Sequence, residues 1–239
     1  MKKKLGLIAA VVVAAAIFPT AGLAAVNGVV VGKSRGTLAV ASASGAIHTV
    51  RAHMSPRIGS RVRINGTRVR VIGRAHRVRV HAVIVRRVGG TTFLAGGHSL
   101  FAVRTGRTLS SLVDRTQPST GTVVNTTAAV SGGGLTATST QVVGQLGSIQ
   151  VQAVVTAVGA GTITLSVNGQ PLVLSLPAGI QLPSSLVNQT VTLTLNLTGA
   201  QPVARDDDEQ GDDNDQGDDN DDQGDDNDQG DEGGGDGDG

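Results

Sequence analysis

Arginine alternates with an aliphatic residue in three short runs, 61–64, 68–71 and 77–80. In a β-strand this alternation places the guanidinium groups on one face and the apolar side chains on the other. Gly66 and Gly73 stand between the runs, where turns or bulges belong. If the runs are neighbouring strands, their arginines form a ladder, and like charges opposite each other destabilise a sheet unless an anion relieves them. We predict an anion-binding surface that contacts phosphate or carboxylate groups, made of Arg61, Arg63, Arg68, Arg70, Arg77 and Arg79.

The charges are segregated along the chain. The formal net charge of +1 comes from 20 basic and 19 acidic residues. Sixteen of the basic residues lie between Lys33 and Arg115, whereas 18 of the acidic residues lie in 206–239, and Asp114 is the remaining one. Residues 116–204 contain no Lys, Arg, Asp or Glu. Such asymmetry indicates an electrostatic partner, in the same chain or outside it. The alternative for the basic block is a solvated face that keeps the protein soluble.

The acidic segment repeats a short unit of Asp, Asn, Gln and Gly that resembles the first half of a calcium-binding loop. The closing bidentate Glu is missing, so we expect weak, multivalent Ca²⁺ association and no other cofactor. Because no apolar residue follows Ala204, we predict a disordered tail over residues 205–239. The candidate oxygen ligands are Asp212, Asn214, Asp219, Asp221, Asp225 and Asn227.

Residues 1–24 have the pattern of a secretory signal peptide. Three lysines precede the apolar stretch 5–18, and Pro19 and several small residues follow it. We predict cleavage after Ala24 and an exported bacterial protein, secreted or associated with the cell envelope, without a stable membrane span after cleavage. The alternative is an uncleaved anchor, because residues 5–25 are just long enough to cross a bilayer.

The composition argues against an enzyme. There is no Cys, so thiol nucleophiles, thiolate metal sites and disulfides are excluded. Asp114 is the one carboxylate before the tail, no Gly-x-Ser-x-Gly or Walker-type motif is present, and the five histidines have no zinc-site spacing. Only Phe93 and Phe101 remain as aromatic residues after the signal, which is a poor platform for stacking nucleobases. The same scarcity argues against an aromatic carbohydrate site.

Val, Thr and Gly predict short strands joined by tight turns. Asn168-Gly169 predicts a hairpin, and a further one is expected around residues 131–134. Two stretches share a pattern of strands and glycine turns, one starting at Gly28 and a looser one at Ala153. We expect an all-β chain of two small antiparallel β-barrel or sandwich modules. The predicted parts are a basic module at 25–105, a linker at 106–120, an uncharged module at 121–204 and the tail.

The pattern Gly-x-Val, Gly-Thr-Leu-x-Val and Gly-Ser-x-Val-x-Ile of residues 28–64 carries a resemblance. It resembles the small β-barrel modules of uncharacterised secreted bacterial proteins, a domain of unknown function similar in outline to OB-type barrels. The match covers residues 27–87, with a second copy at 150–199. The resemblance implies a barrel fold and transfers no functional residue, and OB-like shape alone does not imply nucleic-acid binding.

Together these features lead to a function hypothesis. We expect an exported, non-catalytic binding or structural protein whose arginine-rich β surface binds a polyanionic envelope polymer or acidic lipid headgroups. Its own acidic tail would compete for that surface, loosely and in a salt-sensitive way. The alternative is a calcium-responsive extracellular protein in which Ca²⁺ neutralises the tail.

Overall fold

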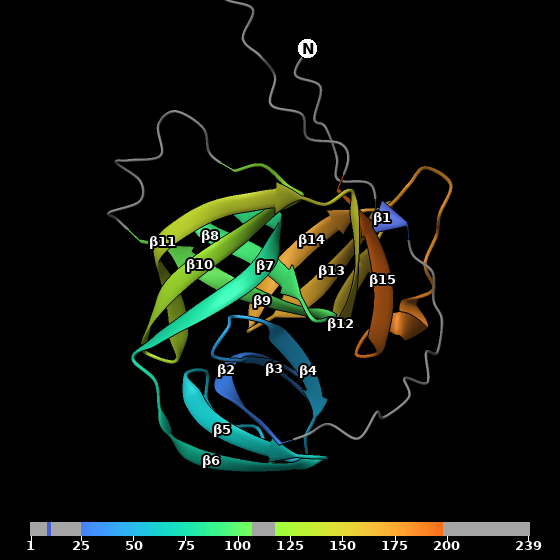
Figure 1. Cartoon of the computed structure of the whole chain (residues 1–239). Helices are drawn as coiled ribbons and strands as arrows, with labels where there is room; N and C mark the ends of the chain where they lie inside the picture. The colour runs from blue at the N-terminus through green and yellow to red at the C-terminus, as the bar shows by residue number, and fades with distance from the viewer. Residues whose placement is uncertain (1–8, 11–24, 107–117, 198–239) are drawn as a thin grey trace, which may run out of the picture. The chain divides into compact units, whose positions relative to one another are not determined.

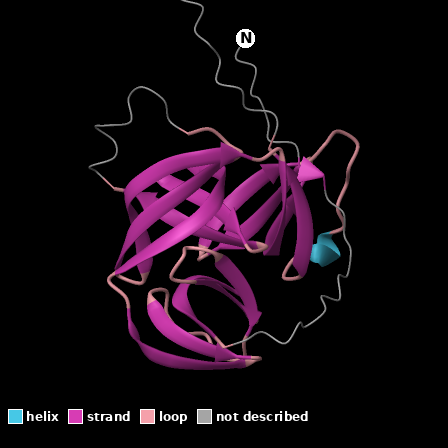
Figure 2. Ribbon diagram, viewed as in Figure 1, coloured by secondary structure: helices cyan, strands magenta, loops and turns pink. Residues whose placement is uncertain are grey.

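The computed structural model describes residues 9–10, 25–106 and 118–197, and Figures 1 and 2 show their arrangement. These residues form an all-β structure of two sheets, as the sequence predicts. Within the described ranges the one helical element is η1, a 3-10 turn at Ser184–Leu186. Most of the predicted signal peptide and linker, and the whole acidic tail, lie outside the described residues.

The smaller sheet has five strands in the order β4-β3-β2-β5-β6, blue to teal in Figure 1. All of its pairings are antiparallel. The turn at residues 66–67 joins β5 to β6, so the two predicted arginine runs form one hairpin. The strands are β2 (Val26–Ser34), β3 (Thr37–Ala41), β4 (Ile47–Arg51), β5 (Ser60–Asn65) and β6 (Arg68–Arg74).

The larger sheet contains a closed ring of five strands, in which β7 pairs with β8, β8 with β9, β9 with β11, β11 with β10, and β10 with β7. The contact between β9 and β11 is parallel, and the other four are antiparallel. The ring closes over a short stretch, because β9 and β11 share only two residue pairs, Thr136 with Arg104 and Ala137 with Thr105. The strands are β7 (Arg77–Val88), β8 (Thr91–Gly96), β9 (Ser99–Thr105), β10 (Thr122–Ser131) and β11 (Gly134–Gln145).

The rest of the larger sheet follows the order β14-β13-β12-β15, with antiparallel pairings throughout. It joins the ring through one parallel pair, Gln152 with Ser99. The short strand β1 (Ala9–Ala10) pairs antiparallel with β15. The remaining strands are β12 (Ser148–Gly159), β13 (Thr162–Val167), β14 (Gln170–Ser175) and β15 (Thr190–Asn196).

Three sets of strands, β2–β6, β7–β11 and β12–β15, repeat the same local geometry. The first strand of each carries a register shift against the second, at Val30/Gly32, Ile84/Arg86 and Val155/Ala157. Each residue before that shift accepts a backbone hydrogen bond of 2.8 Å from a residue with positive φ that precedes the fourth strand. The donors are Gly59 in the first set, Gly121 in the second and Asn188 in the third.

The strand pairings divide the chain at a different place from the expected modules. β7, β8 and β9 fall within the predicted basic module, yet they pair with β10 and β11 and belong to the larger sheet. The two sheets separate at residues 75–76, and the expected linker at 106–120 falls in the sequence between β9 and β10, two strands of the same ring. The change in charge near residue 116 therefore marks a change of surface composition and leaves the strand pairing unaffected.

Aliphatic side chains fill the interior, and the two aromatic residues of this region, Phe93 and Phe101, are both buried. One cluster joins residues of β2, β3 and β4 to the ring around Phe101. Another joins β7, β8 and β9 to the strands β12–β15. The three sets of strands therefore share their cores, and the fold does not depend on disulfides, since the chain has no Cys.

Replacement of Gly59 by Ala is expected to destabilise the fold by about 3 kcal/mol or more. Gly59 has a φ of +87°, and a Cβ atom there would lie 2.1 Å from Cγ1 of Val130. The matched control is Gly36→Ala, where φ is +71° and nothing lies within 4 Å of the added Cβ. That variant should lose only about 1–2 kcal/mol. Urea unfolding followed by circular dichroism measures both, and equal losses would contradict the packing at Gly59.

Candidate anion-binding surface

The arginines of β5 project from the outer face of the smaller sheet. Residues of this strand alternate between exposed and buried, with Arg61 and Arg63 exposed and Val62 and Ile64 buried. Val62 and Ile64 pack in the core cluster of that sheet. The apolar half of the alternation therefore anchors the strand, and the charged half is held at the surface by it.

β6 brings two further arginines to the same face. Arg70 lies directly opposite Arg63, and Arg68 lies opposite Asn65. Directly opposed residues have Cβ atoms about 4.5–5.5 Å apart, so the guanidinium groups of Arg63 and Arg70 share one patch of surface. Arg61 faces Gly73 across the register shift, which leaves open space beside its side chain. We call this patch the arginine face, and it consists of Arg61, Arg63, Arg68 and Arg70.

Arg77 and Arg79 are not on the β5–β6 hairpin, and the condition for a ladder over three neighbouring strands is not met. Both residues are exposed on β7, which pairs with β10 in the larger sheet and is not a neighbour of β6. Arg77 lies opposite Ala129 and Arg79 opposite Thr127. The alternation of β7 also ends at Ala82, where four consecutive buried residues begin. Strand alternation identifies a face correctly but does not identify the neighbouring strand.

The arginine face has no carboxylate near it in the described part of the chain. Fourteen Lys and Arg residues fall in residues 25–106 and 118–197, and these ranges contain no Asp or Glu. The four guanidinium groups of the face make no hydrogen bond within these ranges either. Their positive charge is therefore uncompensated by the described residues, and anionic oxygens are the ligands that guanidinium forks accept best.

Other basic residues have structural contacts instead. Arg35 donates from Nη1 to the carbonyl of Asn188 at 3.2 Å, and Arg86 donates from Nη1 to the carbonyl of Val173. Arg87 is half-buried, and desolvation lowers the pKa of its guanidinium from the ordinary value. Arg35 and Arg86 therefore connect different strands or turns, whereas the arginines of β5 and β6 face solvent.

A polar groove of about 510 Å³ lies beside Arg79. His81 contacts two residues that line the groove. The backbone N–H of His81 donates to the carbonyl of Gly45 at 2.8 Å, and Nδ1 of His81 lies 2.7 Å from Oδ1 of Asn125. The groove presents one guanidinium group together with hydroxyl and amide groups, which suits hydrogen bonding to an anionic or polyhydroxylated ligand. Its lining residues are Ser44, Gly45, Arg79, Val80, Asn125, Thr126, Thr127, Ser139, Thr140 and Gln141.

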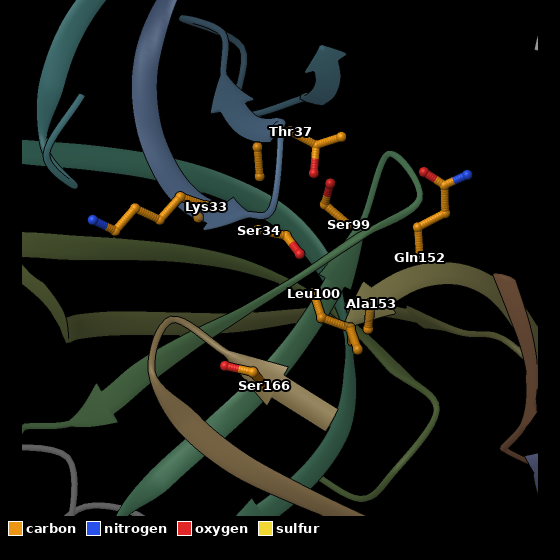
Figure 3. A pocket seen from close by; sticks show the side chains of 10 residues that line it. Lys33, Ser34, Thr37, Ser99, Leu100, Gln152, Ala153 and Ser166 are labelled. Carbon is orange, nitrogen blue, oxygen red and sulfur yellow. The ribbon is translucent and has the colours of Figure 1, made fainter. Parts of the chain in front are cut away.

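A second hollow, shown in Figure 3, is too small for a substrate. It has a volume of about 10 Å³, roughly the space of one water molecule. Ser34 places a buried hydroxyl there that has no partner among the described residues. The hollow lies where β2, β9, β12 and β13 meet, so it is a joint between the three sets of strands. The labelled lining residues are Lys33, Ser34, Thr37, Ser99, Leu100, Gln152, Ala153 and Ser166.

Asn168, in the turn between β13 and β14, forms two hydrogen bonds with the backbone of β2. Its side-chain amide donates from Nδ2 to the carbonyl of Val31 at 3.1 Å, and its Oδ1 accepts from the N–H of Lys33 at 3.1 Å. Asn168 has a φ of +52°, and Gly169 a φ of +78°, as the Asn-Gly hairpin predicted from the sequence requires. A turn residue of the third set of strands therefore hydrogen-bonds to the backbone of β2 at the register shift of the first set.

The change Asn168→Gly is expected to cost about 1–3 kcal/mol of stability, because glycine keeps the positive φ and removes both hydrogen bonds. Asn188→Gly is the matched control. Asn188 also has a positive φ of 67°, but its side chain makes no hydrogen bond within the described residues. That change should alter stability by less than about 0.5 kcal/mol. Thermal or urea unfolding compares the stability of the two variants. If Asn188→Gly loses as much stability as Asn168→Gly, the two hydrogen bonds of Asn168 do not account for the loss.

The sequence also nominated calcium ligands in the tail, and all six lie outside the described residues. Within the described ranges, no group of three or more His, Asp, Glu or Cys side chains gathers where a metal ion could bind. Over the same ranges, no helix is both long enough and apolar enough to be a membrane span. Neither protein-family models nor curated proteins give a match to this chain.

Proposed function

We propose that the protein is an exported, non-catalytic binding protein whose arginine face holds polyanions. The observation that carries the proposal is the direct opposition of Arg63 and Arg70, with Arg61 and Arg68 on the same face. Like charges in cross-strand positions destabilise a sheet. Four such charges share this surface, and the described residues provide no carboxylate to balance them. This arrangement supports a role in which an anion occupies the surface.

The shape of the surface favours a polymeric ligand over a small one. The four arginines are exposed on a hairpin and not enclosed in a pocket, so each can contact a separate anionic group. Phosphate or carboxylate groups repeated along an envelope polymer, or packed in acidic lipid headgroups, provide that chemistry. Arg79 and the polar groove beside it would extend the contact on the larger sheet. The OB-type resemblance rests on residues 27–87 and 150–199, most of which lie outside the ring β7–β11, and it remains part of this proposal.

The acidic tail is the proposed competitor for the arginine face. It has 18 carboxylates in residues 206–239. A flexible chain of this length spans on the order of 30 Å, whereas a folded body of this size has a radius of gyration of about 16 Å. Reach is therefore no obstacle. The screening length is about 8 Å at physiological salt, so the contact would be multivalent and would weaken as salt rises.

Binding of the full chain to polyphosphate and to vesicles containing an anionic phospholipid, each over a salt series, tests the proposal. Polyanion binding predicts a linear fall of log K with log salt. If the protein binds polyphosphate but not the vesicles, the ligand is a soluble anionic polymer. If it binds the vesicles but not polyphosphate, the ligand is an acidic lipid headgroup. Absence of binding to both probes at low salt would reject the proposal.

A calcium-responsive role remains a second proposal, favoured by the repeated spacing of Asp and Asn from Asp212 to Asn227. Calcium bound to the tail would neutralise it and release the arginine face. Titration calorimetry of Ca²⁺ into the full chain is the test. Saturable heats would support a dedicated response, whereas weak and non-saturating heats would leave only condensation of Ca²⁺ on a carboxylate-rich chain.

A further inference from the structure

The third set of strands is one strand shorter than the other two. In the first set, the fourth strand β5 pairs with β6, and in the second set, the fourth strand β10 pairs with β11. The fourth strand of the third set is β15, which pairs with β12 along one edge. On its other edge β15 pairs with β1, with Ala9 opposite Leu195 and Ala10 opposite Thr194.

The sequence after β15 is a poor source of the missing strand. A hairpin return like those of the other two sets would draw on the residues that follow Leu197. Pro202 falls in this stretch and cannot donate to a strand ladder, and three aspartates begin at Asp206. Asp is also depleted in strands. The sequence that follows β15 therefore does not favour a fifth strand for the third set.

The edge of β15 is also unprotected. Its sequence, Thr-Val-Thr-Leu-Thr-Leu-Asn, has no charge and no proline, and Val191, Leu193 and Leu195 face the core. Exposed strand edges usually have charges or proline that prevent pairing with other chains. β6, the edge strand of the smaller sheet, has that protection in Arg68, Arg70 and Arg74. An uncharged edge without proline is suited to strand addition.

We propose that the free edge of β15 is an acceptor site for an extended apolar strand, and that its occupant in the unprocessed chain is the N-terminal segment around Ala9 and Ala10. The pairing of β1 with β15 places that segment at the site in antiparallel register. The segment lies in the apolar stretch 5–18, which has no charged residue. If the chain is cleaved after Ala24, as the sequence predicts, processing removes the occupant and opens the site.

Hydrogen exchange of residues 190–196 tests this proposal in the mature chain, 25–239, and in the full chain. The probe is a peptide of residues 2–18, in which the three lysines aid solubility. At a peptide concentration about ten times its Kd, exchange of these amides in the mature chain should slow by about tenfold. In the full chain they should be protected without peptide, and Ala10→Pro should remove that protection.

A charged residue at the acceptor edge supplies the matched control. Thr194→Lys places a charge opposite Ala10 and should abolish peptide protection, whereas Thr164→Lys, on β13, should leave it intact. Unchanged exchange of residues 190–196 with peptide in excess would overturn the proposal. Protection that rises with protein concentration in the mature chain alone would also overturn it, because the occupant would then be a second copy.

Discussion

Deletion of residues 206–239 is expected to raise the affinity of the protein for polyphosphate by about 10- to 100-fold at low salt. The tail has 18 carboxylates, and the described body has 14 basic residues without a carboxylate. Under the proposed function, the tail and polyphosphate would compete for the same arginine face. The advantage of the truncated protein should shrink as salt approaches physiological strength, because screening weakens the internal contact. Isothermal calorimetry or fluorescence anisotropy of labelled polyphosphate measures both values.

The control for this deletion is a full-length chain in which every Asp and Glu of residues 206–239 is replaced by Asn or Gln. It keeps the length of the tail and removes its charge. If competition is electrostatic, this chain should bind like the truncated protein. If the truncated protein binds polyphosphate no better than the full chain, the competition hypothesis is rejected. If the chain with the uncharged tail still binds more weakly than the truncated protein, the size of the tail and not its charge causes the inhibition.

Replacement of the four arginines of the arginine face by glutamine is expected to lower polyphosphate affinity by about 100-fold or more in the truncated protein at low salt. The slope of log K against log salt should fall by about 3, since each lost phosphate contact removes nearly one unit. The same variant should be slightly more stable, by about 0.2–1 kcal/mol, because the repulsion between Arg63 and Arg70 disappears.

A second quadruple variant separates the arginine face from general basicity. It replaces four exposed basic residues away from β5 and β6, and it therefore has the same net charge. Its affinity should fall by less than about tenfold, and it should show no gain in stability. Equal losses in the two variants would mean that the total charge matters and that the position of the arginines does not. The control residues are Lys33, Arg51, Arg57 and Arg104.

Local patterns predicted the strands well. The alternation of residues 61–64 and 68–71 correctly predicts two strands, β5 and β6. The apolar side chains of this alternation are buried on β5, whereas Val69 on β6 is half-buried and Val71 is exposed. Asn168-Gly169 and the glycines at 132–134 correctly predict the hairpins β13–β14 and β10–β11. These signals succeed because turn chemistry and side-chain alternation depend on neighbouring residues alone.

Strand partners could not be predicted in the same way. The run at 77–80 has the same alternation as β5, yet β7 continues into the buried residues 82–85 and pairs with β10. The change of charge between β9 and β10 predicts a module boundary there, whereas both strands belong to the middle set, β7–β11. Charge describes the solvated faces of a sheet, whereas pairing depends on the buried faces and on turn geometry.

The central claim is that the arginine face and the tail act on the same ligand, and a double-mutant cycle tests it most directly. Polyphosphate affinity would be measured at low salt for four proteins: the full chain, the tail deletion, the arginine-face variant, and both changes together. The account predicts that deletion of the tail raises affinity only when the arginine face is intact. An equal gain from the deletion in the arginine-face variant would contradict it.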